Sequence, residues 1–365
     1  MSKQDLGIEW GGYFDFYNQL SSQAHTPSPV TPAGPSVLEG RFFDRHSNQL
    51  TLNMAEFSVR KKTGKLSFRT DFAFGEMVDQ LSGGGSQSLT GTGVGQNPTN
   101  SAANEPTRNI TQAILTYAVN EQLTINVGKF YTHMGLEVTK AKDNWQYSRS
   151  YAFNYGTFWH EGLSGTFAVV PGKFSTTIYL VNAWDGRISQ EQNKSSTVGA
   201  NFNFTGIEDL VLNYNYVGGE EMNNVSRREV HELNLTYSLK PDLTFAADFN
   251  LGSQNKVPSI GNVKWNSMAL YLRAQINEKY IISPRFEIFD DSDKGFVLAG
   301  AFSNVGAKQK ISSWTLANNF TLDDGLEARI ELRSDKSSSN LFFKDKEGRN
   351  TDSQDSLTAA LLYAF

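Results

Sequence analysis

The sequence predicts an all-β protein, a closed antiparallel transmembrane β-barrel of sixteen strands in one domain that spans residues 1–365. Three observations lead to this fold class. Apolar and polar residues alternate along most of the chain, in segments of about ten residues. The connections between these segments are short and long in turn, and the chain ends inside an alternating segment.

The alternating segments carry apolar residues on one face and polar residues on the other. In residues 242–252, Phe245 and Phe249 fall on one face, whereas Asp248 and Asn250 fall on the other. This period of two is typical of strands, and no segment indicates a helix longer than two turns. The predicted strands are residues 6–17, 49–60, 64–75, 109–119, 122–132, 160–170, 173–183, 196–205, 209–218, 229–238, 242–252, 264–276, 279–290, 309–320, 325–334 and 355–365.

Long and short connections between the predicted strands alternate along the chain. Those after odd-numbered strands run from about ten to over thirty residues. Bacterial outer-membrane barrels combine an even strand number with short periplasmic turns and long external loops. Both chain ends would then lie on the periplasmic side. The short connections follow the even-numbered strands: Lys61–Thr63, Asn120–Glu121, Pro171–Gly172, Gly206–Glu208, Leu239–Pro241, Asn277–Glu278 and Thr321–Asp324.

The last strand ends on "LTAALLYAF", with Phe365 as the final residue. Hydrocarbon offers no hydrogen-bond partner to a backbone N–H or C=O group, so a sheet in lipid must close on itself. The last strand is therefore expected to pair with the first, and Phe365 to lie at the periplasmic interface.

Aromatic residues gather near both ends of the predicted strands, as expected for the interfacial girdles of a membrane barrel. Ordinary enrichment of aromatic residues in strands is the alternative explanation. The periplasmic set is Phe174, Phe204, Tyr237, Phe245, Tyr280, Phe320 and Phe365, and the outer set is Phe14, Phe16, Phe72, Phe74, Tyr131, Tyr214, Tyr216 and Phe249.

The amino-acid composition excludes several kinds of structure and function. There is no cysteine, which excludes disulfides and cysteine-ligated metals. The net charge of -5 gives no basic face for nucleic acid. No apolar run reaches the roughly 18 residues of a transmembrane helix, and residues 1–5 show no signal-peptide core. The five histidines lack metal-ligand spacing, so no metal, cofactor or catalytic group is predicted. The acidic stretch Asp290–Gly295 lacks the EF-hand spacing and is expected to be an external acidic turn; calcium bound by this loop is the alternative.

Several stretches together resemble a known family. They are "VGKFYTHMGLE" (Val127–Glu137), "YLVNAWDG" (Tyr179–Gly186), "RFEIFDDSDKG" (Arg285–Gly295), "LEARIELRSD" (Leu326–Asp335) and the terminal "LLYAF". With the strand pattern, they resemble the β-barrel porin-2 family of bacterial outer-membrane porins, which is related to phosphate-selective and general porins. The resemblance implies passive diffusion of small solutes, a homotrimer in outer-membrane lipid and lipopolysaccharide, and a terminal Phe365 that barrel-insertion machinery reads.

The same resemblance implies that the third long loop, residues 133–159, folds into the lumen. Its charges would then face the wall and set a transverse field at a constriction. The alternative is an external loop with solvated charges. The constriction residues predicted for this loop are Glu137, Lys140, Lys142, Asp143 and Arg149.

Charged residues at alternate strand positions are expected to line a water-filled lumen, because a basic residue facing lipid at the midplane costs about 2–4 kcal/mol. Mutual salt bridges that only stiffen the wall are the alternative. The predicted wall residues are Lys65, Arg69, Asp71, Arg273, Arg285, Glu287, Glu327, Arg329, Glu331 and Arg333.

The sequence thus indicates a passive outer-membrane channel, not an enzyme, for ions and small hydrophilic solutes. The mixed signs of the wall charges predict weak selectivity, and no dense Arg or Lys ladder supports phosphate selectivity. The alternative is a surface-binding barrel, an adhesin or phage receptor, that acts through its external loops.

Overall fold

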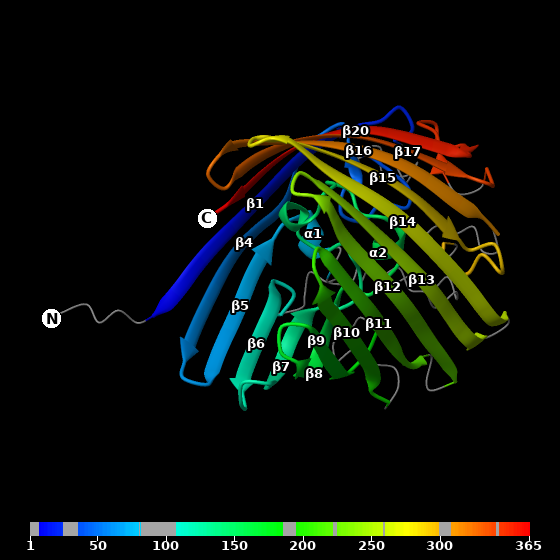
Figure 1. The fold of residues 1–365 in the computed structure, drawn as a ribbon. Helices are drawn as coiled ribbons and strands as arrows, with labels where there is room; N and C mark the ends of the chain where they lie inside the picture. Colours follow the sequence, from blue (N-terminus) through cyan, green and yellow to red (C-terminus); the bar gives the residue numbers. More distant parts are fainter. Residues whose placement is uncertain are drawn as a thin grey trace.

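A computed structural model describes residues 7–24, 36–79, 81, 107–184, 195–221, 225–257, 260–298, 308–340 and 343–365. Within these ranges, sixteen antiparallel strands close into one barrel in which each strand pairs with its sequence neighbours (Figure 1). They are β1 (Ile8–Leu20), β4 (Leu50–Thr63), β5 (Leu66–Phe74), β6 (Ile110–Ala118), β7 (Leu123–Tyr131), β8 (Trp159–Val170), β9 (Phe174–Val181), β10 (Thr197–Ile207), β11 (Leu210–Glu221), β12 (Ser226–Lys240), β13 (Leu243–Val257), β14 (Gly261–Asn277), β15 (Tyr280–Asp290), β16 (Lys310–Asp323), β17 (Leu326–Ser337) and β20 (Ser353–Ala364).

The barrel closes where β1 meets β20, which confirms the predicted pairing of the chain ends. The register runs from Tyr13 opposite Ala364 to Leu20 opposite Leu357. Gly12 N–H donates to the Phe365 carbonyl at 3.0 Å, and Phe365 N–H donates to the Gly12 carbonyl at 3.1 Å. No sheet edge is left along this seam, as the lipid environment requires.

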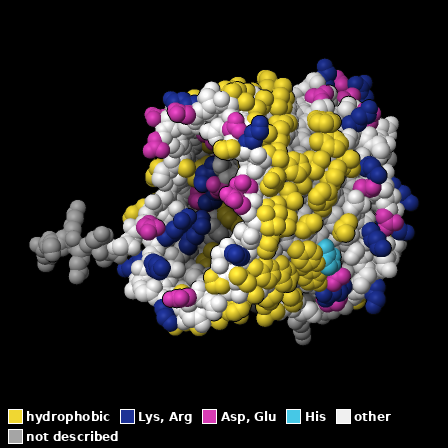
Figure 2. Space-filling view, viewed as in Figure 1, with side chains coloured by type: hydrophobic (Ala, Val, Ile, Leu, Met, Phe, Trp, Pro, Cys, Tyr) yellow, Lys and Arg dark blue, Asp and Glu magenta, His cyan; other side chains and the backbone are white. Residues whose placement is uncertain are grey.

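Burial is reversed relative to a soluble protein. On β17, Ile330 and Leu332 expose 47% and 52% of their surface, whereas Glu331 between them exposes 1%. The apolar side chains form a broad band over the outer wall (Figure 2). The polar side chains point inward, where they avoid the cost of a charge facing hydrocarbon.

Two of the predicted long connections are wrong. Connections of about ten residues were expected after residues 209–218 and 242–252, but β11 continues to Glu221 and β13 to Val257, while β12 begins at Ser226 and β14 at Gly261. Beyond the apolar band, both faces of these strands are polar, so the alternation disappears although the ladder continues, as in Gly219 opposite Arg228.

The interior is partly packed, which corrects the expectation of a purely aqueous lumen. Segments of the long connections carry short elements: β2 (Ser36–Val37), β3 (His46–Ser47), α1 (Glu76–Asp79), η4 (Ala141–Asp143), α2 (Tyr151–Asn154), β18 (Phe343–Lys344) and β19 (Asn350–Thr351). Phe43, Tyr147 and Phe158 from these connections join inward-facing Tyr13 and Tyr17 in one buried cluster. Among the described residues, no helix is long and apolar enough to cross a membrane.

Most predicted girdle residues lie on the outer wall, for example Phe249 and Tyr237, each about two-fifths exposed. Tyr131 does not, because it packs against the buried cluster inside the barrel. It is the last residue of β7, where the chain turns into the connection to β8, so strand parity no longer fixes its direction.

Gly128 on β7 provides a test of the barrel wall. Its φ is +135°, and a Cβ there would come within 1.9 Å of the Ala113 carbonyl oxygen on β6. Gly128→Ala should destabilise the barrel by at least about 1–3 kcal/mol, since neither backbone can move without breaking the ladder. The measurement is the temperature at which the folded band disappears in SDS gel electrophoresis. Gly165→Ala on β8, with no atom within 4 Å, is the control; equal transitions for both variants would contradict the model of this wall.

Candidate functional site: the loop against the inner wall

The connection between β7 and β8, residues 132–158, makes its contacts with inward-facing residues of the barrel wall. On β17, the Glu331 carboxylate accepts the backbone N–H groups of Tyr147 at 2.6 Å and Ser148 at 3.1 Å. On β15, Glu287 accepts the N–H of Tyr151 at 2.7 Å. Two wall carboxylates therefore hold the backbone directly before α2 and at its first residue.

The wall arginines complete this arrangement by donating to loop carbonyl groups. Arg329 Nη1 donates to the carbonyls of Ala141 at 2.8 Å and Gln146 at 3.1 Å. Arg333 Nη1 donates to the Arg149 carbonyl at 2.6 Å. The alternating carboxylates and guanidinium groups of β17 thus match the donors and acceptors of one peptide segment.

A buried chain of ion pairs links this segment to neighbouring elements. Arg285 lies 2.6 Å from Glu137 and 3.5 Å from Glu287. Glu287 also lies 3.2 Å from Arg333, which pairs with Asp335 at 2.8 Å. Each buried charge has partners of opposite sign, and this compensates part of the cost of removing it from water.

The chain of charges continues into the first long connection. Arg41 pairs with Asp44 at 2.5 Å and with Asp335 at 3.0 Å, and all three side chains are fully buried. The sequence predictions missed Arg41, Asp44 and Asp335. Asp335 lies one residue beyond predicted strand 325–334 on the inward parity, which was an available signal, whereas nothing in the sequence around Arg41 indicates an inward position.

The opposite side of the loop meets β1, β4 and β5. Lys140 Nζ pairs with Glu56, a residue missed by the predictions, and lies 3.8 Å from Asp71. Asp71 also pairs with Arg69 at 2.6 Å. The hydroxyl of Tyr147 donates to Asp15 at 2.8 Å.

Arg149 faces the loop itself. Its guanidinium donates to the carbonyls of Val138, Tyr147 and Thr139, and it lies over the Phe43 ring with a 5.1 Å separation. Arg149 therefore stabilises the internal turn of the loop, and its side chain makes no ion pair with the wall among the described residues.

Lys142 and Asp143 are the most open of the predicted loop charges. They pair with each other at 2.8 Å, and their side chains expose 34% and 48% of their surface. They border a polar cavity of about 350 Å³, together with Glu9, Arg60 and Arg69. Figure 2 shows a hollow surrounded by charges of both signs at the barrel end where β1 begins.

The remaining predicted wall residues vary. Glu327 pairs with Arg329 on β17, and Arg273 on β14 is half-buried at an inward position. Lys65 lies in the turn between β4 and β5, where its Nζ donates to the Val119 carbonyl at 2.7 Å. Lys65 therefore belongs to the barrel end and not to the wall, because β4 extends to Thr63 and shifts the turn.

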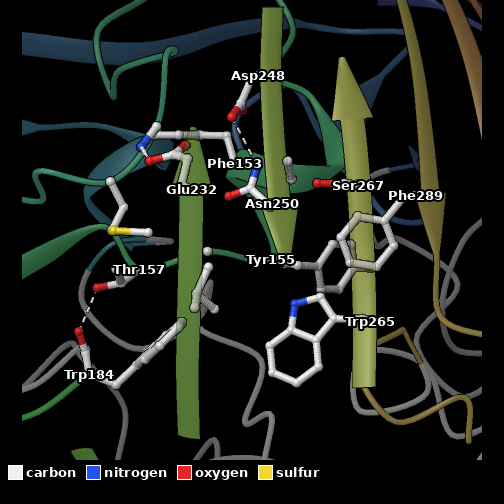
Figure 3. A pocket seen from close by; sticks show the side chains of 15 residues that line it. Phe153, Tyr155, Thr157, Trp184, Glu232, Asp248, Asn250, Trp265, Ser267 and Phe289 are labelled. Carbon is white, nitrogen blue, oxygen red and sulfur yellow. Dashed lines mark hydrogen bonds between the residues drawn. The ribbon is translucent and has the colours of Figure 1, made fainter. Parts of the chain in front are cut away.

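A second small cavity lies between α2 and β12–β14 (Figure 3). Glu232 accepts the Gly135 N–H at 2.8 Å and the Asn215 amide at 2.8 Å. Asp248 accepts the Asn250 amide at 3.0 Å. The aromatic rings of Tyr155 and Trp265 line the other side, and the free space of about 30 Å³ is enough to hold at least one water molecule.

Solved structures with the same fold are outer-membrane proteins. The chain superposes on the anion-selective porin from Comamonas acidovorans with a TM-score of 0.62 at 11% identity, covering 98% of this chain and 99% of that one. Outer-membrane expressed OmpT of Vibrio cholerae gives 0.60 at 10% identity, covering 100% and 99%. In-vitro folded OmpT in its trimer form gives 0.58 at 9% identity, covering 98% and 99%. At such low identity these likenesses show the fold alone.

No match was found among curated protein sequences. The model of the family described as "Putative beta-barrel porin-2, OmpL-like" matches residues 7–365. The closed barrel, its polar interior and this match lead to one conclusion: the chain belongs to this family of porins and is a passive channel of the bacterial outer membrane.

Proposed function

We propose that ions and small hydrophilic solutes diffuse through this barrel past a constriction formed by the loop at residues 132–158, with weak charge selectivity. The observation that carries the proposal is the pairing of charges. Glu137 is neutralised by Arg285, Lys140 by Glu56 and Lys142 by Asp143. The fifth predicted charge, Arg149, donates to backbone carbonyls of the loop itself. A constriction in which the other charges are paired retains only a small transverse field.

The expected partners follow from the barrel's outer surface. Trp10 on β1 exposes 62% of its surface and Leu361 on β20 exposes 44%, so this seam presents apolar side chains to lipid or to another subunit. The trimer form of a structure with the same fold supports a homotrimer. We further propose lipid and lipopolysaccharide around the barrel, recognition of Phe365 by insertion machinery, and no catalytic activity, because the family is one of channels.

His133 anchors the start of the loop. Its ring stacks on Tyr179 with centroids 4.1 Å apart, and its Nε2 lies 2.9 Å from the Tyr216 carbonyl oxygen. Because a carbonyl only accepts, Nε2 carries the proton. Gly199 leaves room for the ring, since a Cβ there would lie 2.6 Å from His133 Cε1. Burial lowers the pKa of His133 to about 4.

Purified protein in a planar bilayer should give discrete conductance steps and a small reversal potential under a salt gradient, because the constriction charges cancel. Steps in threes would support the trimer. A large reversal potential would contradict weak selectivity. Folded, inserted protein without steps would contradict a diffusion channel and favour the surface-binding alternative.

Arg285→Met should loosen the attachment of the loop to β15, because it removes the partner of Glu137 and leaves only the contacts of Glu287 and Ser283 on this strand. Breaking such a buried pair costs about 3–5 kcal/mol, so the variant should be less stable, and its open channel should be larger and noisier. Single-channel recording checks this. Arg273→Met removes an inward arginine that donates no hydrogen bond to the loop within the described structure, and it is the matched control. Identical traces for both variants would contradict a loop held by Arg285.

Stability should fall as the pH decreases from about 6.5 to about 4. Unfolded His133 binds a proton near its ordinary pKa of about 6.5, whereas the folded state resists protonation until about 4. The folded state therefore loses up to about 3 kcal/mol across this window. Thermal unfolding measured at several pH values should show a smaller loss for His133→Gln. Equal slopes for the wild-type protein and His133→Gln would count against His133.

A further inference from the structure

The two halves of the inner wall differ in chemistry. Charged residues crowd β15 and β17, where the loop is held. In contrast, β9 and β10 contain no charged residue, and β11 has none before Glu220. The inward positions of this second half carry amides and hydroxyls, so the lumen has one charged side and one neutral side.

The neutral side begins on β6 and β7. Thr116 Oγ1 donates to Asn126 Oδ1 at 2.7 Å, and Asn126 Nδ2 donates to Ser164 Oγ on β8 at 3.2 Å. Two residues further along β8, the hydroxyls of Thr166 and Thr177 lie 2.9 Å apart. These hydrogen bonds connect four neighbouring strands at paired positions.

The row continues over β10 and β11. Thr177 lies opposite Asn201 in the strand register. Asn201 Nδ2 donates to Asn215 Oδ1 at 2.6 Å, and Asn203 Nδ2 donates to Asn213 Oδ1 at 2.8 Å. Together with the residues on β6–β9, these form what we term the amide–hydroxyl row, which follows the inner wall across six strands.

The loop leaves part of this row accessible, because Ser164, Thr177 and Asn215 are buried but the other members of the row are half-buried. The hydrogen bonds and ion pairs of the loop end on β1, β4, β5, β8, β11, β12 and β15–β17. On β8 the contact is with His160, and on β11 it is with the Tyr216 carbonyl, so neither is with a side chain of the row. Asn203 and Asn213 remain only half-buried, as do Thr116 and Thr166. A solute that passes the loop therefore meets neutral groups on this side.

Neutral amides and hydroxyls both donate and accept hydrogen bonds. They can replace the water bonded to a solute hydroxyl, which also does both. An ion that leaves part of its hydration shell is best stabilised by an unpaired charge of opposite sign, and the charges of the opposite wall are already paired. We infer that the permeation path follows the amide–hydroxyl row and favours uncharged, hydroxyl-rich solutes, such as sugars and polyols, over ions of the same size. This inference rests on the proposed diffusion function.

Fluxes through proteoliposomes containing the full chain test the inference. A hexitol, gluconate and glucosamine share a six-carbon skeleton and differ in charge. The wild-type protein should pass the hexitol several-fold faster than either ion. If the protein conducts salt but passes the hexitol no faster than the ions, the inference falls while the diffusion function stands; if neither salt nor solute passes, the diffusion function itself falls.

Asn213→Asp tests the location of the path. The new carboxylate can still accept the Asn203 amide, so the row stays connected and gains one negative charge. Glucosamine flux should rise several-fold relative to gluconate flux. Gln254→Glu makes the same amide-to-carboxylate change beside Arg228, whose Nε lies 2.8 Å from Gln254, and should leave the ratio unchanged. An unchanged ratio in a folded, conducting Asn213→Asp channel would place the path elsewhere and overturn the inference.

Discussion

The architecture depends on one constraint: the hydrocarbon around the barrel offers no partner to a backbone donor or acceptor. Pairing of β1 with β20 satisfies the last two free edges, and the bonds between Gly12 and Phe365 complete the seam. The same environment assigns the apolar face of every strand to the outside. Polar and charged side chains therefore face the interior, where they line the path that solutes would take.

Because charged side chains face the interior, they can bind the irregular backbone of the loop between β7 and β8. The peptide groups of residues 141–151 are donors and acceptors that need partners away from bulk water. Glu331 and Glu287 take the N–H groups, and Arg329 and Arg333 take the carbonyls. The wall charges therefore serve first to position the loop, and little net charge is left to select ions.

The interior is also asymmetric. The charged wall of β15 and β17 supports the loop, whereas the amide–hydroxyl row of β6–β11 stays partly accessible beside it. The charges of β15 and β17 are paired, and the amide–hydroxyl row is neutral. An interior of this kind is better suited to the diffusion of uncharged hydrophilic molecules than to selection of ions of one sign.

The sequence by itself determined the barrel. The period of two indicates strands with lipid on one face and water on the other, and the regular order of short and long connections indicates that neighbouring strands are antiparallel. It also determined that Arg285, Glu287, Arg329, Glu331 and Arg333 point inward, since strand parity is local. Only the tertiary structure decided what these residues bind. Their partners, such as Glu137 and the carbonyls of residues 141–149, lie more than one hundred residues away in an irregular loop without periodicity. Likewise, Arg41 and Glu56 acquire their roles only when the closed barrel brings their segments face to face.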